Sequence, residues 1–216
     1  MSRIYELVDK LCPNGVPYIE LGKLASIRNG FSYKADKDRS RRYKGSRIET
    51  ISKGGFDLDR VATVDEIDAS YRLQVGDILF SHINSLPYLG NCAYYTNEVG
   101  ELYHGMNLLD IRCISDEIMP RYLWYYMHTY RWWLYIYRDA KRAINQCSIS
   151  TSDMKRWLVP LPSIKMQQEI VRILDAFQEL DETLGGELAA RERQFGYFRL
   201  FGGFCGRDSG IGPAQR

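Results

Sequence analysis

The side chains that most often carry catalysis are present, but their spacing does not match a catalytic site. The segment 57–68, DLDRVATVDEID, is rich in carboxylates. Clustered carboxylates can hold a divalent metal for phosphodiester cleavage, yet no catalytic lysine pattern lies nearby, and a solvated acidic loop explains the same residues. The chain also lacks a Walker-type phosphate loop, the GxSxG nucleophile motif and the HExxH zinc motif. The sequence therefore predicts no catalytic residue.

Methyl-transfer chemistry and metal binding are not indicated either. NSLPY, residues 84–88, is the nearest approach to the Asn/Asp-Pro-Pro-aromatic motif of adenine methyltransferases, and its spacing differs. His82, His104 and His128 are far apart, and the five cysteines include no CxxC pair. These spacings do not match a zinc site. We expect no metal and no cofactor.

The composition is that of a folded domain with a substantial core. Of 216 residues, 45% are hydrophobic and 13% are aromatic, as in globular proteins. The N-terminal stretch lacks the apolar block of a signal peptide, and no run of about 18 apolar residues could span a membrane. Scattered cysteines without an export signal are typical of reduced thiols. We expect a cytoplasmic protein that makes no membrane contact.

Charge is distributed unevenly, although the formal net charge is only +2. Residues 34–47 hold seven basic and two acidic residues, and residues 131–156 hold six basic and two acidic ones. Residues 167–193 show the reverse, with seven acidic and three basic residues. This pattern favours a body that binds a polyanion and a C-terminal segment that does not. Two solvated surfaces of opposite charge would explain it equally.

Short apolar runs separated by turn residues predict a succession of strands. Residues 47–52, 78–81, 92–95 and 108–114 are the strand candidates. The last of them alternates apolar and polar residues, which predicts a half-buried strand. Residues 3–11 predict a short amphipathic helix.

Residues 120–138 predict one aromatic-rich helix, with Pro120 in its first turn. Exposed aromatic residues can stack on nucleic-acid bases, but an aromatic stripe at helical spacing is more typical of a core. We interpret the stripe as core-facing. Its members are Leu123, Met127, Tyr130, Leu134 and Tyr137.

The last quarter of the chain predicts a long helix that starts after Pro162, with Ser163 as its N-cap. Its apolar residues follow the 3-4-3-4 spacing of a coiled-coil seam, which slips by four residues near Gly185-Gly186. Two glycines cost about 2 kcal/mol in a helix interior, so we expect a kink or break there. The seam consists of Ile170, Ile173, Phe177, Leu180 and Leu184 and continues at Leu188. Because segment 3–11 is too short to cover it, a second chain is the simpler partner.

Four stretches of the chain together carry a family pattern. They are LCPNGVPYIELGKL (11–24), GDILFSHINSLPYLGNCAYYTNE (76–98) with HGMNLLDIR (104–112), PRYLWYYMHTY (120–130) and INQCSISTSDMKRWLVPLPSIKMQQEIVRILDAF (144–177). They resemble the specificity (S) subunits of type I restriction–modification systems. The last stretch is the most specific, because Gln, Ser-Ile-Ser, a strand, Leu-Pro, Gln and Ile-Val-x-Ile-Leu follow one another in it.

The resemblance implies an adaptor and not an enzyme. S subunits carry two target-recognition domains and two long conserved helices that pack antiparallel, and each recognition domain reads one half of a split DNA site. They recruit adenine-N6 methyltransferase subunits and, in the full complex, ATP-dependent restriction subunits. This chain holds one recognition domain and one long helix, so it resembles a half subunit, either natural or truncated.

The implied fold is α+β: a mixed α/β target-recognition domain with short strands, followed by one long α-helix that pairs antiparallel with a partner helix. The expected parts are a short N-terminal helix (1–16), the recognition domain (17–162), a spacer and dimerisation helix (163–200) and a disordered tail (201–216). A homodimer of such halves would read an interrupted palindrome. The alternative is a stand-alone dimeric DNA-binding regulator without a methyltransferase partner.

Contacts with double-stranded DNA are expected from three polar sets, since Lys and Arg suit phosphates while Arg, Asn, Gln, Ser and His suit base edges. The first set is Lys34, Arg39, Arg41, Arg42, Lys44 and Arg47. The second, in a loop that the family places near DNA, is Lys141, Arg142, Asn145 and Gln146. The third, past the end of a strand, is Ser81, His82 and Asn84. A solvated basic loop would explain the first set equally, and His82 would equally suit a structural hydrogen bond.

Overall fold

The structure, a computed structural model, describes residues 15–32, 43–51, 55–144 and 146–202. The helix expected at 3–11 and the tail from residue 203 lie outside these ranges. The chain forms two compact units, which divide after Val171. Each unit is therefore described by itself.

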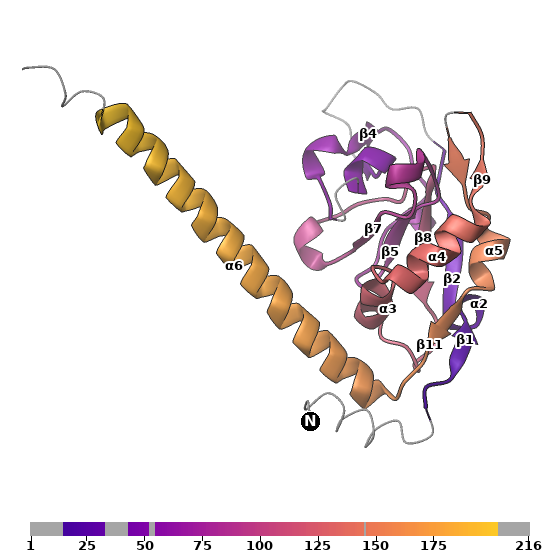
Figure 1. The fold of residues 1–216 in the computed structure, drawn as a ribbon. Helices are drawn as coiled ribbons and strands as arrows, with labels where there is room; N and C mark the ends of the chain where they lie inside the picture. The colour runs from indigo at the N-terminus through magenta and orange to yellow at the C-terminus, as the bar shows by residue number, and fades with distance from the viewer. Residues whose placement is uncertain (1–14, 33–42, 52–54, 145, 203–216) are drawn as a thin grey trace, which may run out of the picture. The chain divides into compact units, whose positions relative to one another are not determined.

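The first unit combines short strands with short helices, and the second consists of most of one long helix (Figure 1). The strands are β1 (Tyr18–Glu20), β2 (Ala25–Asn29), β3 (Tyr43–Gly45), β4 (Ala62–Val64), β5 (Ile78–Ser81), β6 (Ile83–Asn84), β7 (Cys92–Tyr94), β8 (Leu108–Cys113), β9 (Lys141–Arg142), β10 (Cys147–Ser148) and β11 (Leu158–Pro160). The helices are α2 (Leu21–Leu24), α3 (Pro120–Tyr126), α4 (Tyr130–Asp139), α5 (Thr151–Lys155) and α6 (Ile164–Gly202). The expected α+β fold with short strands and a long C-terminal helix is confirmed.

A four-stranded antiparallel sheet with the order β2-β8-β5-β7 forms the centre of the first unit. Three small antiparallel sheets surround it, with the orders β6-β10-β9, β3-β4 and β1-β11. In the last of these, Ile19 pairs with Val159. The beginning and the end of the domain are thereby joined beside the point where α6 starts.

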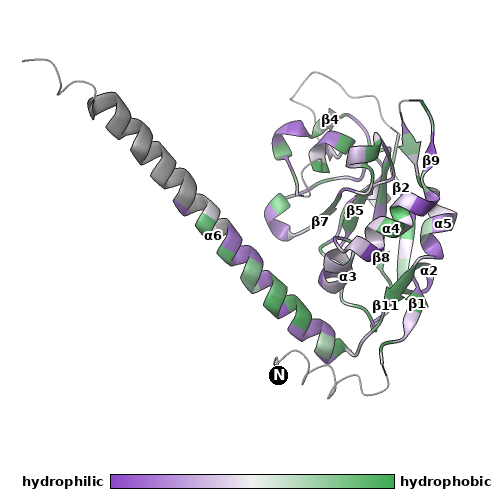
Figure 2. Ribbon diagram, in the orientation of Figure 1, coloured by the Kyte–Doolittle hydropathy of each residue, from purple (hydrophilic) through white to green (hydrophobic). Residues whose placement is uncertain are grey.

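Strand β8 is buried on both faces, so the prediction of a half-buried strand is wrong. Leu109 and Ile111 belong to a large core that includes residues of α3, α4, α5 and β11. Leu108 points into a second core on the opposite face of the sheet. Between them, Asp110 is also fully buried. The alternation in the sequence reflects one buried carboxylate and not a solvated face, and Figure 2 shows the hydrophobic strands grouped inside the domain.

The described part of the strand predicted at 47–52, residues 47–51, does not form a strand. The structure has a 3-10 turn at Ile48–Ile51 instead. The Thr50 hydroxyl accepts the backbone N–H of Arg47 at 2.9 Å and donates to the carbonyl of Arg60 at 3.2 Å. Such local side-chain-to-backbone bonds compete with strand pairing.

The single helix predicted at 120–138 is two helices, α3 and α4, separated at residues 127–129. Thr129 starts the second helix, because its hydroxyl accepts the N–H of Trp132 as an N-cap. The break rotates the second half of the predicted stripe out of the core. Trp132 and Ile136 are the buried residues of α4, whereas the stripe members Tyr130, Leu134 and Tyr137 are exposed.

Helix α6 is continuous from Ile164 to Gly202, so the break predicted at Gly185-Gly186 is wrong. Two glycines cost about 2 kcal/mol, whereas restarting a helix with a nucleation constant of about 10⁻³ costs roughly 4 kcal/mol. Continuing the helix is thus the cheaper solution. Its first turn follows Ser163 as predicted, and the carbonyl of Ser163 accepts the N–H groups of Met166 and Gln167. Among the helices of the described residues, none is both long and apolar enough to cross a membrane.

Candidate nucleic-acid interface

The antiparallel sheet brings distant polar segments to one of its edges. Strands β2 and β5 end where β8 begins, as the pairs Asn29↔Leu109 and Ser81↔Leu108 show. Strand β3 joins this edge because Gly45 bridges to Tyr103, and the β9–β10 hairpin joins it by pairing with β6, just after β5. We call this region the basic edge. It carries Lys44, Arg47, Lys141, Arg142 and Gln146.

The β9–β10 hairpin brings the second and third predicted sets together. Cys147 of β10 pairs with Arg142 on one side and with Asn84 on the other. The hairpin is closed by a hydrogen bond from the N–H of Ala143 to the carbonyl of Gln146 at 2.9 Å. The Arg142 guanidinium lies 4.9 Å from the ring centroid of Tyr137 on α4. This cation–π contact orients a basic side chain that is otherwise open to solvent.

The third predicted set lies mostly inside the domain. Ser81 is fully buried and His82 nearly so. The amide of half-buried Asn84 donates to the Ser81 hydroxyl at 3.0 Å, and its oxygen accepts the N–H of Ser85 at 2.8 Å. A buried hydroxyl or imidazole cannot reach a DNA groove in this conformation. Their hydrogen bonds instead fix the segment from β5 to β6, with which the β9–β10 hairpin of the basic edge pairs.

Burial also sets the charge of His82. Desolvation lowers the pKa of its imidazole to about 4, although a hydrogen bond to the backbone of Asn107 acts in the opposite direction. His104, which is fully buried in the segment before β8, has its pKa lowered to about 4 for the same reason. Both rings are therefore neutral at physiological pH and contribute hydrogen bonds instead of positive charge.

A turn at residues 104–107 projects from the basic edge, just before β8 begins. The backbone of Phe31 bridges to Gly105, and the N–H of Gly105 donates to the Ser46 hydroxyl at 3.0 Å. Met106 is 43% exposed, and Asn107 is half-buried with a φ of 66°. This turn is not among the contact sites predicted from the sequence. The signal was Gly-x-Asn directly before an apolar strand, a pattern typical of a tight turn.

The structure leaves part of the predicted basic loop undescribed. Lys34, Arg39, Arg41 and Arg42 of the first set, and Asn145 of the second, lie outside the described residues. The residues on either side of segment 33–42 are Ser32 and Tyr43. Ser32 contacts the 104–107 turn, and Tyr43 contacts Tyr103, just before it. The Ser32 hydroxyl lies 3.8 Å from the sulfur of Met106, and the Tyr43 ring lies 5.3 Å from that of Tyr103. The described residues on either side of this gap, Ser32 and Tyr43, thus both lie at the basic edge.

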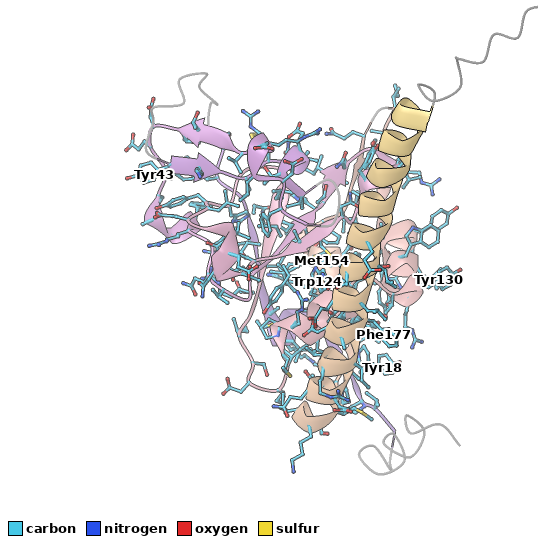
Figure 3. The ribbon with its side chains drawn as sticks, turned by 90° about the vertical axis from the view of Figure 1, so that its left-hand side faces the viewer. Tyr18, Tyr43, Trp124, Tyr130, Met154 and Phe177 are labelled. Carbon is cyan, nitrogen blue, oxygen red and sulfur yellow. The ribbon has the colours of Figure 1, made fainter. Side chains whose placement is uncertain are left out.

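Three aromatic side chains stack along the outer face of α4. The ring centroids of Tyr130 and Trp133 are 5.9 Å apart, and those of Trp133 and Tyr137 are 5.2 Å apart, both nearly parallel. Tyr130 is 72% exposed and projects from the helix (Figure 3). The stack ends at Arg142, so it borders the basic edge.

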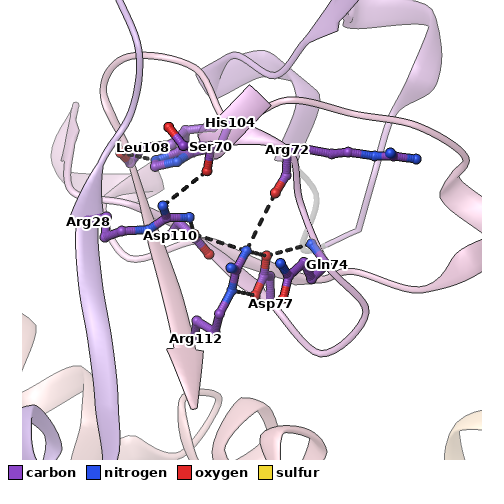
Figure 4. A network of polar contacts seen from close by, with 9 residues as sticks. All are labelled: Arg28, Ser70, Arg72, Gln74, Asp77, His104, Leu108, Asp110 and Arg112. Atoms are coloured by element: carbon purple, nitrogen blue, oxygen red, sulfur yellow. Dashed lines mark hydrogen bonds and ion pairs between the residues drawn. The ribbon is translucent and has the colours of Figure 1, made fainter. Parts of the chain in front are cut away.

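Within the central sheet, two buried carboxylates are paired with two arginines (Figure 4). Arg112 donates to both oxygens of Asp77 at 2.7 and 2.6 Å, and Arg28 donates to Asp110 at 2.5 Å. Burial raises the pKa of the Asp110 carboxyl, and the charge of Asp77 adds to this effect, while Arg28 opposes it. Since each of these guanidinium groups already has a carboxylate partner, the network holds β2, β5 and β8 together and does not offer a free cation to a ligand.

The acidic segment 57–68 has local structural contacts. Asp57 forms an ion pair with Arg60 at 3.2 Å, and Asp68 accepts the N–H of Ser70 at 2.7 Å at the start of a 3-10 turn. Within the described part of the chain, no group of three or more His, Cys, Asp or Glu side chains is placed to hold a metal ion.

The predicted seam of α6 divides between the two units. Ile170 is half-buried and packs against the large core of the first unit. Ile173 is also half-buried. Beyond it the apolar side chains are exposed, with Phe177 at 64%, Leu180 at 53% and Leu184 at 54%. The side chain of Leu188 lies outside the described residues.

Comparison with known proteins identifies the family. A family model for the type I restriction modification DNA specificity domain matches residues 13–190. Over 169 residues the chain is 40% identical to a putative type I restriction enzyme MjaX specificity subunit of Methanocaldococcus jannaschii. That alignment covers 76% of this chain and 40% of the relative, so the chain spans less than half of the relative's length.

Two solved structures show the same fold. One comes from a study of complex assembly and conformational transition in the type I R-M system, with a TM-score of 0.61 and 20% identity, covering 86% of this chain and 44% of that chain. The other is the S subunit of a type I restriction–modification system from M. genitalium, with a TM-score of 0.56 and 15% identity, covering 83% and 44%. As the sequence resemblance predicts, the chain belongs to the family of type I restriction–modification specificity subunits, whose role is DNA specificity and not catalysis.

Proposed function

We propose that this chain recognises one half of a split double-stranded DNA target within a cytoplasmic type I restriction–modification complex. The observation that carries the proposal is the basic edge, where the antiparallel sheet gathers cationic side chains from segments about 100 residues apart in the sequence. Lys and Arg on one surface neutralise DNA phosphates, while the polar residues between them face base edges.

We further propose that the recognition domain works as an adaptor. In this proposal it recruits an adenine-N6 methyltransferase subunit and, in the full complex, an ATP-dependent restriction subunit. Family membership supports this role, and the absence of a catalytic motif in the sequence agrees with it.

Helix α6 is proposed to pair antiparallel with the α6 of a second copy. Phe177, Leu180 and Leu184 are large apolar side chains that are each more than half exposed. Burying such a stripe against the same stripe of another copy is the usual solution for coiled-coil spacing. Two copies related by a two-fold axis would present identical recognition domains, so the target is an interrupted palindrome.

The test is to co-express the chain with an adenine-N6 methyltransferase subunit from the same genome and to map methylated adenines on plasmid DNA. An interrupted palindrome is the expected result. If this chain is the only specificity component and the methylated target is split and asymmetric, the homodimer is contradicted. If the chain supports neither methylation nor DNA binding, the recognition role is refuted.

The basic edge itself is tested by salt dependence. The double variant Lys141→Ala/Arg142→Ala removes two cations, so the slope of log K against log salt should become shallower by about 1.8. Lys165→Ala is the matched control, because Lys165 is also exposed but lies in the first turn of α6, away from the basic edge. An unchanged slope in the double variant would remove the hairpin from the interface.

A further inference from the structure

The turn at residues 104–107 has the features of a rigid element that presents side chains to a ligand. It lies on the basic edge, between Ser32, which precedes segment 33–42, and the end of β5, which His82 follows. We propose that Met106 and Asn107 are specificity-determining residues that contact base edges and favour A·T pairs. This proposal rests on the proposed DNA-recognition function and assigns it two residues.

The backbone of the turn is held from several sides. The carbonyl of His104 accepts the N–H of Phe31 at 3.2 Å, and the N–H of His104 donates to the carbonyl of Tyr71 at 2.9 Å. Gly105 is fixed by Ser46, as described above. Gly30 approaches so closely that a Cβ atom there would lie 1.8 Å from the carbonyl oxygen of Gly105. Because contacts are this tight, the position of the turn is set before any ligand arrives.

The two side chains at the tip are the part of the turn that remains available. Met106 is 43% exposed, so part of its apolar side chain is open to a ligand. Its sulfur lies 3.8 Å from the hydroxyl of Ser32. Asn107 adopts a φ of 66°, and no other non-glycine residue in the described ranges has a positive φ. Unusual backbone conformations of this kind concentrate at binding sites.

The chemistry of these two side chains suits one kind of base pair. An asparagine amide can form two hydrogen bonds with one adenine, because its NH₂ group donates to N7 and its oxygen accepts from the N6 amino group. Apolar groups contact the C5-methyl of thymine. Met106 beside Asn107 therefore matches an A·T pair, or adjacent A·T pairs, in the major groove. Neither residue carries charge, so they can discriminate between sequences without adding to phosphate attraction.

His82 is the positioning residue for this turn. It is buried below the tip, and its ring is hydrogen-bonded to the backbone of Asn107. The other ring nitrogen, Nδ1, has no hydrogen-bond partner in the structure. This contact links the end of β5 to the tip and explains why a neutral histidine lies under a basic surface.

The experiment is selection from a pool of DNA duplexes with a randomised central sequence, using the full chain. The variants are Met106→Ala and Asn107→Gly; glycine removes the amide but accepts the positive φ. We expect wild-type protein to enrich a motif. Each variant should lose roughly 5- to 150-fold of its discrimination at one or two A·T positions, because one good base contact contributes this much discrimination. The salt slope should stay unchanged.

The control is Lys141→Ala/Arg142→Ala, which should weaken binding to all sequences while keeping the motif. If wild-type protein enriches a motif that both tip variants retain in full, the assignment of Met106 and Asn107 is overturned while DNA recognition stands. If wild-type protein neither binds the pool nor enriches a sequence, the proposed function fails as well. Circular dichroism of each variant shows that a relaxed motif comes from folded protein.

Discussion

Gln167 provides a quantitative test of how the first turn of α6 is anchored. Its side chain is fully buried, and its amide donates to the carbonyls of Glu117 at 2.7 Å and Pro162 at 2.9 Å. Its oxygen accepts the N–H of Met119 at 2.8 Å. Gln167→Met keeps the size of the side chain and removes all three bonds. At about 1 kcal/mol for each bond, the loss is about 3 kcal/mol.

For a domain of about 150–250 residues, 1 kcal/mol corresponds to about 2–4 °C in melting temperature, so the variant should melt about 6–12 °C lower. Gln168→Met is the matched control, since Gln168 is the same residue type one position along the helix and is exposed. Its effect should stay within about 0.5 kcal/mol. Urea unfolding of both variants gives the free energies, with the midpoint shifting at constant m-value. Equal stabilities of the two variants would refute the anchoring role of Gln167.

Three further predictions concern buried charge, pH and assembly. Arg112→Met leaves Asp77, which is only 1% exposed, without its guanidinium partner. The free energy of unfolding in urea should fall by about 3–5 kcal/mol, and Asp77→Asn in the same chain should restore part of it. A double variant as unstable as the single one would contradict this pairing. Burial holds the pKa of His82 and His104 at about 4 in the folded protein, whereas the same rings titrate near 6.5 in the unfolded chain. The free energy of unfolding should therefore fall as pH drops from 6.5 towards 4, by about 1.4 kcal/mol per pH unit for each ring. A urea midpoint that stays constant over this range would contradict the burial of the two rings. Phe177→Asp places a charge in the proposed seam and should shift the sedimentation of the chain from dimer to monomer, whereas a dimer that persists on dilution would exclude this seam.

Several elements could be predicted because local sequence is sufficient to specify them. The apolar runs at 78–81 and 92–95 became β5 and β7, and the helix after Pro162 begins at Ile164, where proline and serine favour a start. The family resemblance is equally a property of the sequence, since it depends on the order of short motifs. The comparisons confirm it.

Other elements depend on contacts that the sequence does not display. The helical period through 120–138 is nearly continuous, but Thr129 caps a second helix and Trp132 turns into the core beside Trp157, with ring centroids 4.9 Å apart. Segment 47–52 has strand-forming residues, but its described part forms a 3-10 turn in which Thr50 binds the local backbone. In both cases a local side-chain bond decided between two conformations of similar propensity.

The sequence by itself determined the family, the α+β class and the segregation of basic and acidic segments, because these depend on residue types and their order. Only the tertiary structure decided which polar residues face solvent. Ser81 is the last residue of β5 and His82 follows it, yet both are buried. Lys141 and Arg142 are exposed and lie near them through the pairing of β6, β10 and β9. Strand pairing between segments about 60 residues apart creates the basic edge, and such pairing depends on the packing of the whole domain and not on the propensity of either segment.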